Sequence, residues 1–318
     1  MRILVRKARS LRSALANPAS LPHLVRRNWL QLKGWMRGGR PWRYHVFEDV
    51  PFICIPSDDT SLRICQSGYA ETVELGAAYH WTQPGDTCID VGANVGVYSA
   101  VLAHRAGPSG CIFALEPSPR AFVRLVQLLE TLEFDQVTAV AACASDRSGV
   151  VSLYVADTAD AGPEQNSMRV SPDQRDHFRR RLSPAVSLDA LLTASGSVHP
   201  VAVLKVDVEG AEPLVLSAAA AILGAKDRPL VVVEVHLGAL ATFGFTPADV
   251  LKHLPESDYE RVFVPRSTSD SRPGRQFGGV YRVSDATDWP FLSNIIAFPR
   301  GGSFAARRSS IRFIPDSR

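Results

Sequence analysis

A glycine-containing turn follows a short apolar run in the sequence DTCIDVGANVGVYS, residues 86–99. The run ends at Asp90, and Gly92 and Gly96 lack the Cβ atom that would keep a ligand away from the backbone. A helical pattern follows the turn, and the N-terminus of a helix offers free N–H groups to a carboxylate or another anion. Glu116, twenty residues past Gly96 and at the end of the next apolar run, could accept hydrogen bonds from both hydroxyls of a ribose. These residues predict a site for a cofactor that contains a nucleoside.

The residues of this turn also indicate which nucleoside fits it. A dinucleotide site needs the spacing G-x-G-x-x-G, whereas residues 92–96 read G-A-N-V-G. Asp90 would repel a pyrophosphate, but it could hold an ammonium group. S-adenosylmethionine carries an ammonium, a carboxylate and a ribose and has no phosphate, so its charges match the turn better than those of NAD. We therefore expect S-adenosylmethionine as the cofactor, and the alternative is a nicotinamide-dependent oxidoreductase.

Five polar residues close to the ends of two later apolar runs could act on a substrate, namely Lys205, Asp207, Glu209, Glu234 and His236. If the two runs are adjacent parallel strands, both groups of residues lie at the same rim as the cofactor, and residues two apart share a strand face. A hydroxyl acceptor must lose its proton as it attacks a methyl group, so a general base would contribute about 10²–10⁴-fold. His236 is the first candidate because histidine titrates near neutral pH, followed by Asp207, with Glu234 as a third catalytic candidate. Lys205 and Glu209 are expected to bind the substrate.

Three carboxylates and a histidine at one rim could also hold a divalent metal, which would lower the pKa of the acceptor. Carboxylate clusters of this kind more often recognise polar ligands. We therefore expect no metal at this site and activity that survives a chelator.

Short apolar runs that alternate with amphipathic helical patterns would position all of these residues. Runs such as VVVEV, residues 231–235, are rich in β-branched residues and indicate strands that are covered on both faces. The expected strands are residues 87–91, 110–115, 136–142, 150–155, 201–206, 230–235, 259–264 and 294–298. The expected helices are residues 95–105, 119–133, 211–223 and 247–254, after a helical stretch at 61–83 and a strand or hairpin at 44–56. This alternation predicts a doubly wound α/β fold with a mostly parallel sheet.

Two polar stretches and a basic arm interrupt or precede this pattern. Residues 157–184 contain three prolines and three consecutive arginines and are expected to form a lid, a binding loop or a disordered excursion. Residues 265–289 are similarly polar. Residues 1–43 hold eleven of the 35 Lys and Arg residues and no Asp or Glu, so we place a basic N-terminal arm at 1–43 and the catalytic domain at 44–318.

Several of these runs occur in an order that resembles the FkbM family of methyltransferases. The runs are DVGANVGVYS, EPSP at 116–119, SLDAL at 187–191, LKVDVEGAE at 204–212 and VVVEVH at 231–236. The resemblance covers roughly residues 70–298. It implies a Rossmann-like class I methyltransferase with a seven-stranded sheet, S-adenosylmethionine as cofactor, and transfer to a hydroxyl of a sugar, polyketide or related molecule. The family's cofactor positions fall on Asp90, Gly92, Asn94, Gly96 and Glu116, with an adenine contact expected near Asp146.

The charge distribution limits the partners. The arm holds eleven of the 35 basic residues and none of the acidic ones. The body of the chain therefore contains 24 basic and 32 acidic residues and has a net charge of −8. An acidic body argues against nucleic acid as the substrate of the main domain, and the family resemblance implies a small-molecule or glycan acceptor instead. The arm resembles a cationic amphipathic helix, which is more often a solvated helix than a peripheral membrane anchor. If the arm does bind a membrane, a non-catalytic, membrane-associated protein with the same fold is the second alternative.

The five cysteines include no C-x-x-C pair and their number is odd, so neither a disulfide framework nor a zinc site is expected. This pattern favours a reducing compartment, the cytoplasm. The sequence gives no indication of the oligomeric state.

Overall fold

The computed structural model describes residues 40–55, 58–67, 71–156, 166–197, 199–265, 281–282, 289 and 291–311. The chain divides into two compact units, residues 1–70 and residues 71–318. Residues 1–39, most of the predicted basic arm, lie outside the described residues, as does most of the polar stretch 265–289. The predicted membrane contact of the arm therefore stays a prediction.

The described part of the first unit is a hairpin followed by one helix. Strand β1 (Trp42–Phe47) pairs antiparallel with β2 (Val50–Cys54), and α3 (Asp59–Ser67) follows. The hairpin predicted at residues 44–56 is confirmed, although β1 begins two residues before the predicted start of the domain. The helical stretch predicted at 61–83 is two helices, α3 and α4 (Thr72–Trp81), and they belong to different units.

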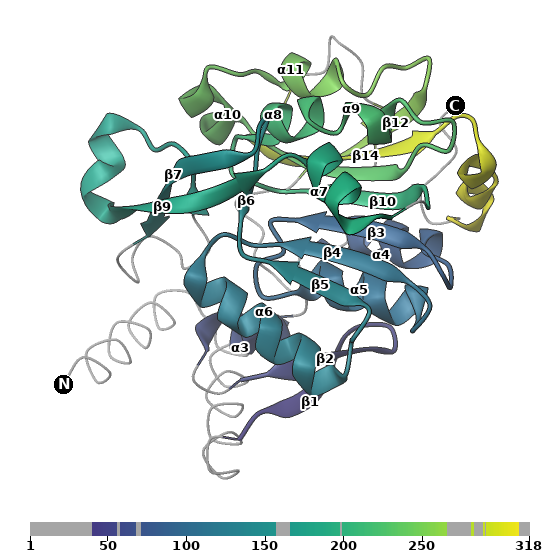
Figure 1. The fold of residues 1–318 in the computed structure, drawn as a ribbon, viewed down its shortest axis with the longest axis horizontal. Coiled ribbons are helices and arrows are strands. Elements are labelled where there is room, and N and C mark those ends of the chain that lie inside the picture. The colour runs from purple at the N-terminus through teal and green to yellow at the C-terminus, as the bar shows by residue number, and fades with distance from the viewer. Residues whose placement is uncertain are drawn as a thin grey trace, which may run out of the picture. The chain divides into compact units, whose positions relative to one another are not determined.

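The second unit is built on a central, mostly parallel sheet with strand order β13-β12-β14-β11-β10-β3-β4-β5 (Figure 1). Its strands are β3 (Thr87–Val91), β4 (Cys111–Leu115), β5 (Val137–Val140), β10 (Val201–Val206), β11 (Leu230–His236), β12 (Tyr259–Pro265), β13 (Tyr281–Arg282) and β14 (Leu292–Pro299). Strand β14 runs antiparallel to both of its neighbours, β11 and β12. Apart from the two-residue β13, the sheet has the seven strands of the predicted Rossmann-like, doubly wound fold.

Helices cover both faces of this sheet, and alternate strand residues contact one face or the other. The helices are α4, α5 (Val97–Ala106), α6 (Pro119–Leu132), α7 (Leu188–Ser195), α8 (Glu212–Ser217), α9 (Ala220–Leu223), α10 (Leu237–Phe243) and α11 (Pro247–Leu251). Ile89, Val91 and Val233 belong to the main apolar core together with residues of α7 to α11. Asp90 is the intervening residue of β3, so its side chain points to the opposite face, where Ser99 of α5 bonds to it. The helix predicted at 211–223 is divided into α8 and α9.

A four-stranded sheet of order β6-β9-β7-β8 adjoins the central sheet. Its strands are β6 (Cys143–Ala144), β7 (Gly149–Ala156), β8 (Asn166–Ser167) and β9 (Phe178–Val186), with a 3₁₀ turn at Pro172–His177. The expectation of an irregular insertion at 157–184 is wrong for β9, which pairs antiparallel with β7 over eight residues. The strand was hidden because most of its side chains are exposed, so the apolar alternation of a half-buried strand is missing. Residues 157–165 lie outside the described residues.

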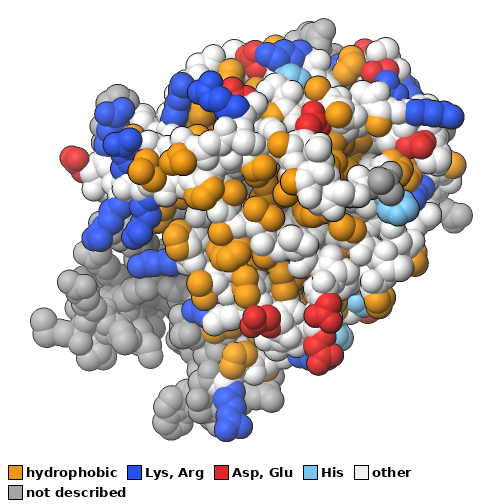
Figure 2. All heavy atoms as spheres, in the orientation of Figure 1, with side chains coloured by type: hydrophobic (Ala, Val, Ile, Leu, Met, Phe, Trp, Pro, Cys, Tyr) orange, Lys and Arg blue, Asp and Glu red, His pale blue; other side chains and the backbone are white. Residues whose placement is uncertain are grey.

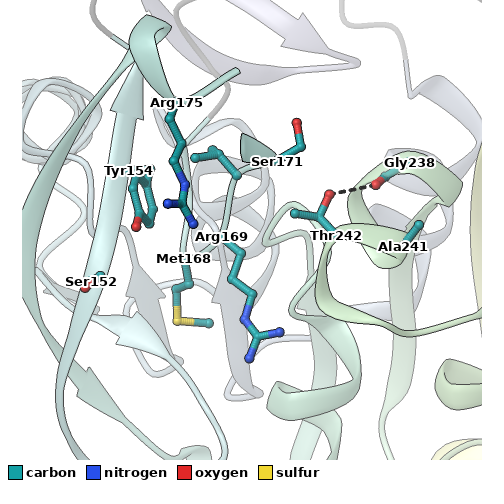
Figure 3. A pocket seen from close by; sticks show the side chains of 10 residues that line it. Ser152, Tyr154, Met168, Arg169, Ser171, Arg175, Gly238, Ala241 and Thr242 are labelled. Atoms are coloured by element: carbon teal, nitrogen blue, oxygen red, sulfur yellow. Dashed lines mark hydrogen bonds between the residues drawn. The ribbon is translucent and has the colours of Figure 1, made fainter. Parts of the chain in front are cut away.

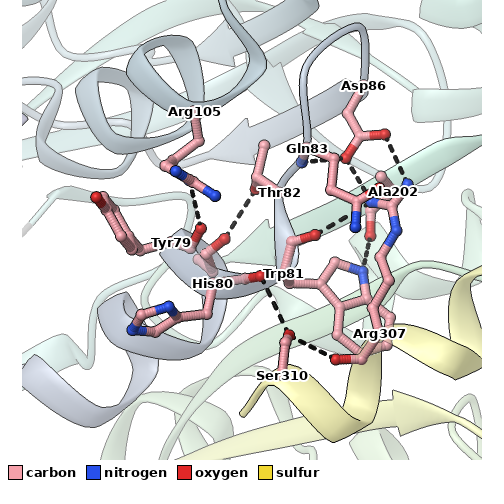
Figure 4. Close-up of polar contacts among 11 residues, drawn as sticks. Tyr79, His80, Trp81, Thr82, Gln83, Asp86, Arg105, Ala202, Arg307 and Ser310 are labelled. Carbon is pink, nitrogen blue, oxygen red and sulfur yellow. Dashed lines mark hydrogen bonds and ion pairs between the residues drawn. The ribbon is translucent and has the colours of Figure 1, made fainter.

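The C-terminal 3₁₀ segment, Ser303–Ser310, is attached to the end of α4 (Figure 4). Arg307 donates to both carboxylate oxygens of Asp86 and to the carbonyl oxygen of Trp81. The indole N–H of Trp81 donates in turn to the carbonyl oxygen of Ala202 in β10, at 3.0 Å. These bonds connect the last described segment to the central sheet. None of the described helices is long and apolar enough to cross a membrane.

Candidate active site

The predicted cofactor turn lies at the C-terminal end of β3, in the centre of the sheet. Asp90 is fully buried, and one of its oxygens accepts a hydrogen bond of 2.6 Å from the hydroxyl of Ser99. Its other oxygen, Oδ1, lies 3.5 Å from the ammonium of Lys205 and has no hydrogen-bond partner. Asp90 therefore has a structural partner on each side of its carboxylate, and its contact with a cofactor ammonium stays a prediction.

The two glycines of the turn are required by packing. Gly92 has φ +74°, and a Cβ atom there would lie 1.8 Å from the backbone oxygen of Asp207 at the end of β10. Gly96 has φ +91°, and a Cβ atom there would lie 2.7 Å from Leu128 and 2.8 Å from Leu125 of α6. Both positions combine a left-handed backbone with a close neighbour, so any other residue would force the turn away from β10 or α6.

Glu116 lies at the end of β4 and faces this turn. One carboxylate oxygen accepts from the backbone N–H of Asn94 at 2.8 Å, and the other accepts from the N–H of Ser118 at 2.7 Å. Burial raises the pKa of Glu116 to about 7, although these two bonds and Lys205 act in the opposite direction. Each carboxylate oxygen has two lone pairs, so Glu116 keeps one acceptor position on each oxygen for a ribose.

Lys205 is the buried cation at the centre of the site. Its ammonium donates to the carbonyl oxygen of Gly92 at 2.6 Å and lies 3.5 Å from carboxylate oxygens of both Asp90 and Asp207. Burial acts to lower the pKa of Lys205, but the surrounding carboxylates outweigh it and raise the pKa above its ordinary value. Lys205 thus stays charged and fixes the spacing between β3 and β10.

The sheet register brings the predicted catalytic residues to one face. Asp90 pairs with Lys205, and Lys205 pairs with Val232, so these three residues share a face. Glu234 and His236 follow Val232 at intervals of two and therefore lie on that face as well. Asp207 is two residues past Lys205 and its side chain is 29% exposed, whereas Glu234 is buried. The sequence-based expectation that the two strand ends meet at one rim agrees with this register.

The hydrogen bonding of His236 restricts its chemistry. His236 is the N-cap of α10, and its Nδ1 accepts from the backbone N–H of Ala239 at 2.9 Å. A nitrogen that accepts this bond carries no proton, so neutral His236 has its proton on Nε2. Burial lowers the pKa of His236, and Asp207 acts in the opposite direction. His236 is therefore built to donate from Nε2 to a neighbouring group.

Two further predicted residues lie at the edges of the site. Glu209 has φ +56°, and its carbonyl oxygen accepts from the hydroxyl of Ser167 in β8. Asp146 is exposed and accepts from the hydroxyl of Ser145, just after β6. The substrate role of Glu209 and the adenine contact of Asp146 stay predictions.

Sequence reasoning missed Glu212, whose Oε1 accepts from the N–H groups of Val208 and Gly210. These bonds hold the loop that carries Asp207. The run LKVDVEGAE contains Glu212, and its position in the first turn of a helix was the available signal.

Two cavities adjoin the strand ends. The smaller has a volume of about 40 Å³ and lies between the cofactor turn and β6, lined among others by Gly92, Leu115, Cys143, Met168 and Asp207. The larger has a volume of about 810 Å³ and lies between the β7–β9 sheet and α10 (Figure 3). Met168 lines both cavities.

These residues fit the cofactor expected from the sequence. Glu116 retains acceptor positions for two hydroxyls, and the buried Oδ1 of Asp90 retains one for an amine. The smaller cavity adjoins the ends of β3 and β4, the strands that carry these two residues. Ligands of open α/β sheets bind beyond the C-terminal ends of the strands, which is where these residues lie. Fold and site together are those expected of a Rossmann-like, S-adenosylmethionine-dependent methyltransferase.

The family follows from the sequence. Residues 90–261, more than half of the chain, match the family described as "Methyltransferase FkbM domain". The chain therefore belongs to the FkbM family of methyltransferases, as its motifs predicted. A search of curated proteins found no significant match.

Solved structures show weak similarity. An FkbM methyltransferase from Methylobacillus flagellatus is 15% identical, with a TM-score of 0.39 over 76% of this chain and 55% of that one. An S-adenosylmethionine-dependent O-methyltransferase from Thermotoga maritima is 16% identical, with a TM-score of 0.38 over 81% of this chain and 77% of that one. An rRNA methylase from Streptococcus thermophilus is 9% identical, with a TM-score of 0.39 over 71% of this chain and 93% of that one. The family assignment rests on the sequence match and not on these structures.

Proposed function

We propose that this protein transfers the methyl group of S-adenosylmethionine to a hydroxyl oxygen of a small molecule or glycan, such as a sugar or a polyketide. The observation that carries the proposal is the position of Asp207. Asp207 lines the same cavity as Gly92 of the cofactor turn, and its partly exposed carboxylate lies beside the buried ammonium of Lys205. A carboxylate in this position can take the proton of an acceptor hydroxyl.

The chemistry asks little of the protein beyond positioning and proton removal. The sulfonium of S-adenosylmethionine supplies a methyl group that is already activated towards a nucleophile. Asp207 accepts the proton of the acceptor hydroxyl, and because its side chain is 29% exposed the proton can pass on to water. The ammonium of Lys205 lies 3.5 Å from the carboxylate of Asp207 and holds that carboxylate in position.

His236, the first base candidate from the sequence, is less suited to that role than Asp207. Its Nδ1 lone pair is engaged by Ala239, and its Nε2 carries the proton. We propose that Nε2–H donates to the acceptor oxygen and orients it, while Glu234 adds negative charge near Lys205. The oxygen that attacks the methyl group is then held between a donor and a base.

The experiment compares two substitutions that preserve local structure. Asp207→Asn keeps the shape of the side chain and removes the base, so we expect kcat to fall by about 10²-fold or more. His236→Asn keeps an N-cap residue for α10 and removes the imidazole, so we expect KM for the acceptor to rise more than kcat falls. Both are measured as formation of S-adenosylhomocysteine with a panel of sugars, glycosides and polyketide lactones.

The two variants separate the assignments. Unchanged affinity for S-adenosylhomocysteine in both shows that the cofactor site is intact. Wild-type kcat in Asp207→Asn, or loss of kcat only in His236→Asn, would rule out Asp207 as the base.

A further inference from the structure

The 810 Å³ cavity opens next to the chemistry described above. A volume in this range is typical of sites for small-molecule ligands. One wall is formed by Gly238, Ala241 and Thr242 of α10, the helix that His236 caps. Met168 lines this cavity and also the smaller one, which Asp207 lines as well. A molecule in the larger cavity can therefore present a hydroxyl to the proposed base.

The lining of this cavity is cationic. Arg169 and Arg175 contribute their side chains, and none of the ten lining residues is acidic. In Figure 3, Arg175 lies beside Tyr154 on one wall, and Arg169 extends between that wall and α10. Tyr154 and Thr242 add hydroxyl groups.

The partners of Arg169 are neutral. Its guanidinium donates to the carbonyl oxygen of Phe243 at 3.3 Å and lies 5.2 Å from the centre of that residue's ring. Among the described residues, no carboxylate forms an ion pair with Arg169 or Arg175. An arginine fork offers five N–H donors, so most of those of Arg169 are left for a ligand.

A third arginine adds to this charge. Arg180 of β9 donates to the hydroxyl of Ser152, which lines the cavity, and it pairs across the sheet with Tyr154. Figure 2 shows Lys and Arg side chains gathered over the part of the surface where Figure 1 places β7 and β9. Positive charge concentrated on one wall of an otherwise acidic body attracts anions to this cavity.

We propose that this cavity is the acceptor site and that the acceptor is an anion, a hydroxylated molecule with a phosphate or carboxylate group. Arg169 and Arg175 bind the anionic group, since planar guanidinium groups match both oxyanions in geometry. The hydroxyl to be methylated points past Met168 towards Asp207. This inference rests on the proposed function, because it supplies the acceptor class for the same site.

The test uses three matched probes, glucose, glucose 6-phosphate and glucuronate, with full-length protein saturated with S-adenosylhomocysteine. Dissociation constants are measured by NMR titration. We expect both anionic probes to bind wild-type protein at least about tenfold more tightly than glucose. The anion that binds more tightly shows whether phosphate or carboxylate is preferred. The double variant Arg169→Gln/Arg175→Gln should lose this preference.

Arg300→Gln is the matched control, because Arg300 is exposed and follows β14, which runs antiparallel to β11 and ends at the opposite edge of the sheet. It should retain the preference for anions. An equal preference in wild type and double variant, or no preference in wild type, overturns the proposal. Failure of S-adenosylhomocysteine to bind wild-type protein is a separate result that contradicts the proposed function itself.

Discussion

At the scale of single residues, the site contains carboxyl groups whose pKa is raised by burial and lowered by hydrogen bonds. Glu212 is almost fully buried, and one of its oxygens accepts two backbone N–H bonds. Burial nevertheless raises the pKa of Glu212 to about 7. Burial likewise raises the pKa of Glu116, although its backbone hydrogen bonds act to lower it. A group whose pKa is higher in the folded than in the unfolded state takes up protons on folding, which links stability to pH.

The first prediction concerns Glu212. The contribution of protonated Glu212 to stability is complete at pH values below 4.5, the ordinary pKa of a glutamate, and is lost as the pH rises through about 7, its pKa in the folded protein. Glu212→Gln keeps an oxygen that accepts from Val208 and Gly210 but cannot ionise. We expect this variant to gain stability relative to wild type when the pH is raised from 5 to 8, measured by urea denaturation at both pH values. A constant difference between the two proteins would show that Glu212 does not titrate in this window.

Loss of the Lys205 side chain should destabilise the fold strongly. Lys205→Met leaves Asp90 buried and without a neighbouring cation, so we expect the free energy of unfolding to fall by about 3–5 kcal/mol. Adding Asp90→Asn should recover part of the loss, because the buried charge is then removed. Chemical denaturation measures both variants, and Lys226→Met, at an exposed lysine, is the control. A loss below about 0.5 kcal/mol, which is usual for surface changes, would contradict the central role of Lys205.

At the scale of elements, strands β3 and β10 have the bounds that the sequence predicted, because strands buried on both faces are short continuous apolar runs. The ends of these strands also located Asp90 and Asp207. Strand β9 was missed because it is mostly exposed. Met168 and Arg169 follow the two-residue strand β8, which is too short to produce a periodic pattern. For this reason the sequence did not predict the segment that supplies half of the lining residues of the larger cavity.

The attachment of the C-terminal segment gives a prediction at this scale. Arg307 forms a bidentate salt bridge with Asp86 and donates a hydrogen bond to the carbonyl oxygen of Trp81 (Figure 4). Its side chain is mostly buried. Arg307→Ala should lower the free energy of unfolding by about 2–3 kcal/mol, since it leaves a buried carboxylate without its partner. Arg307→Lys should recover little, because an ammonium cannot reproduce the fork. Thermal and urea unfolding measure the change, and a full recovery by lysine would show that charge alone matters there.

At the scale of the whole molecule, a net acidic body carries a cationic cavity beside a cofactor turn that bears a carboxylate. In the function proposed above, this distribution separates two tasks that need opposite charges, holding an ammonium-bearing cofactor and attracting an anionic acceptor. Belonging to the FkbM family accounts for the first task. The second task depends on β7 and β9, which belong to the four-stranded sheet and not to the central sheet.

Binding of S-adenosylhomocysteine, measured by calorimetry, tests the central claim most directly. We expect wild-type protein to bind it with a dissociation constant on the order of micromolar and to bind NAD not at all. Glu116→Ala and Asp90→Ala should each weaken binding by about tenfold or more, or about 1.4 kcal/mol. Glu130→Ala, at an exposed residue of α6, should bind like wild type. Undetectable binding by wild-type protein, or wild-type affinity in both site variants, would contradict the claim that this turn holds S-adenosylmethionine.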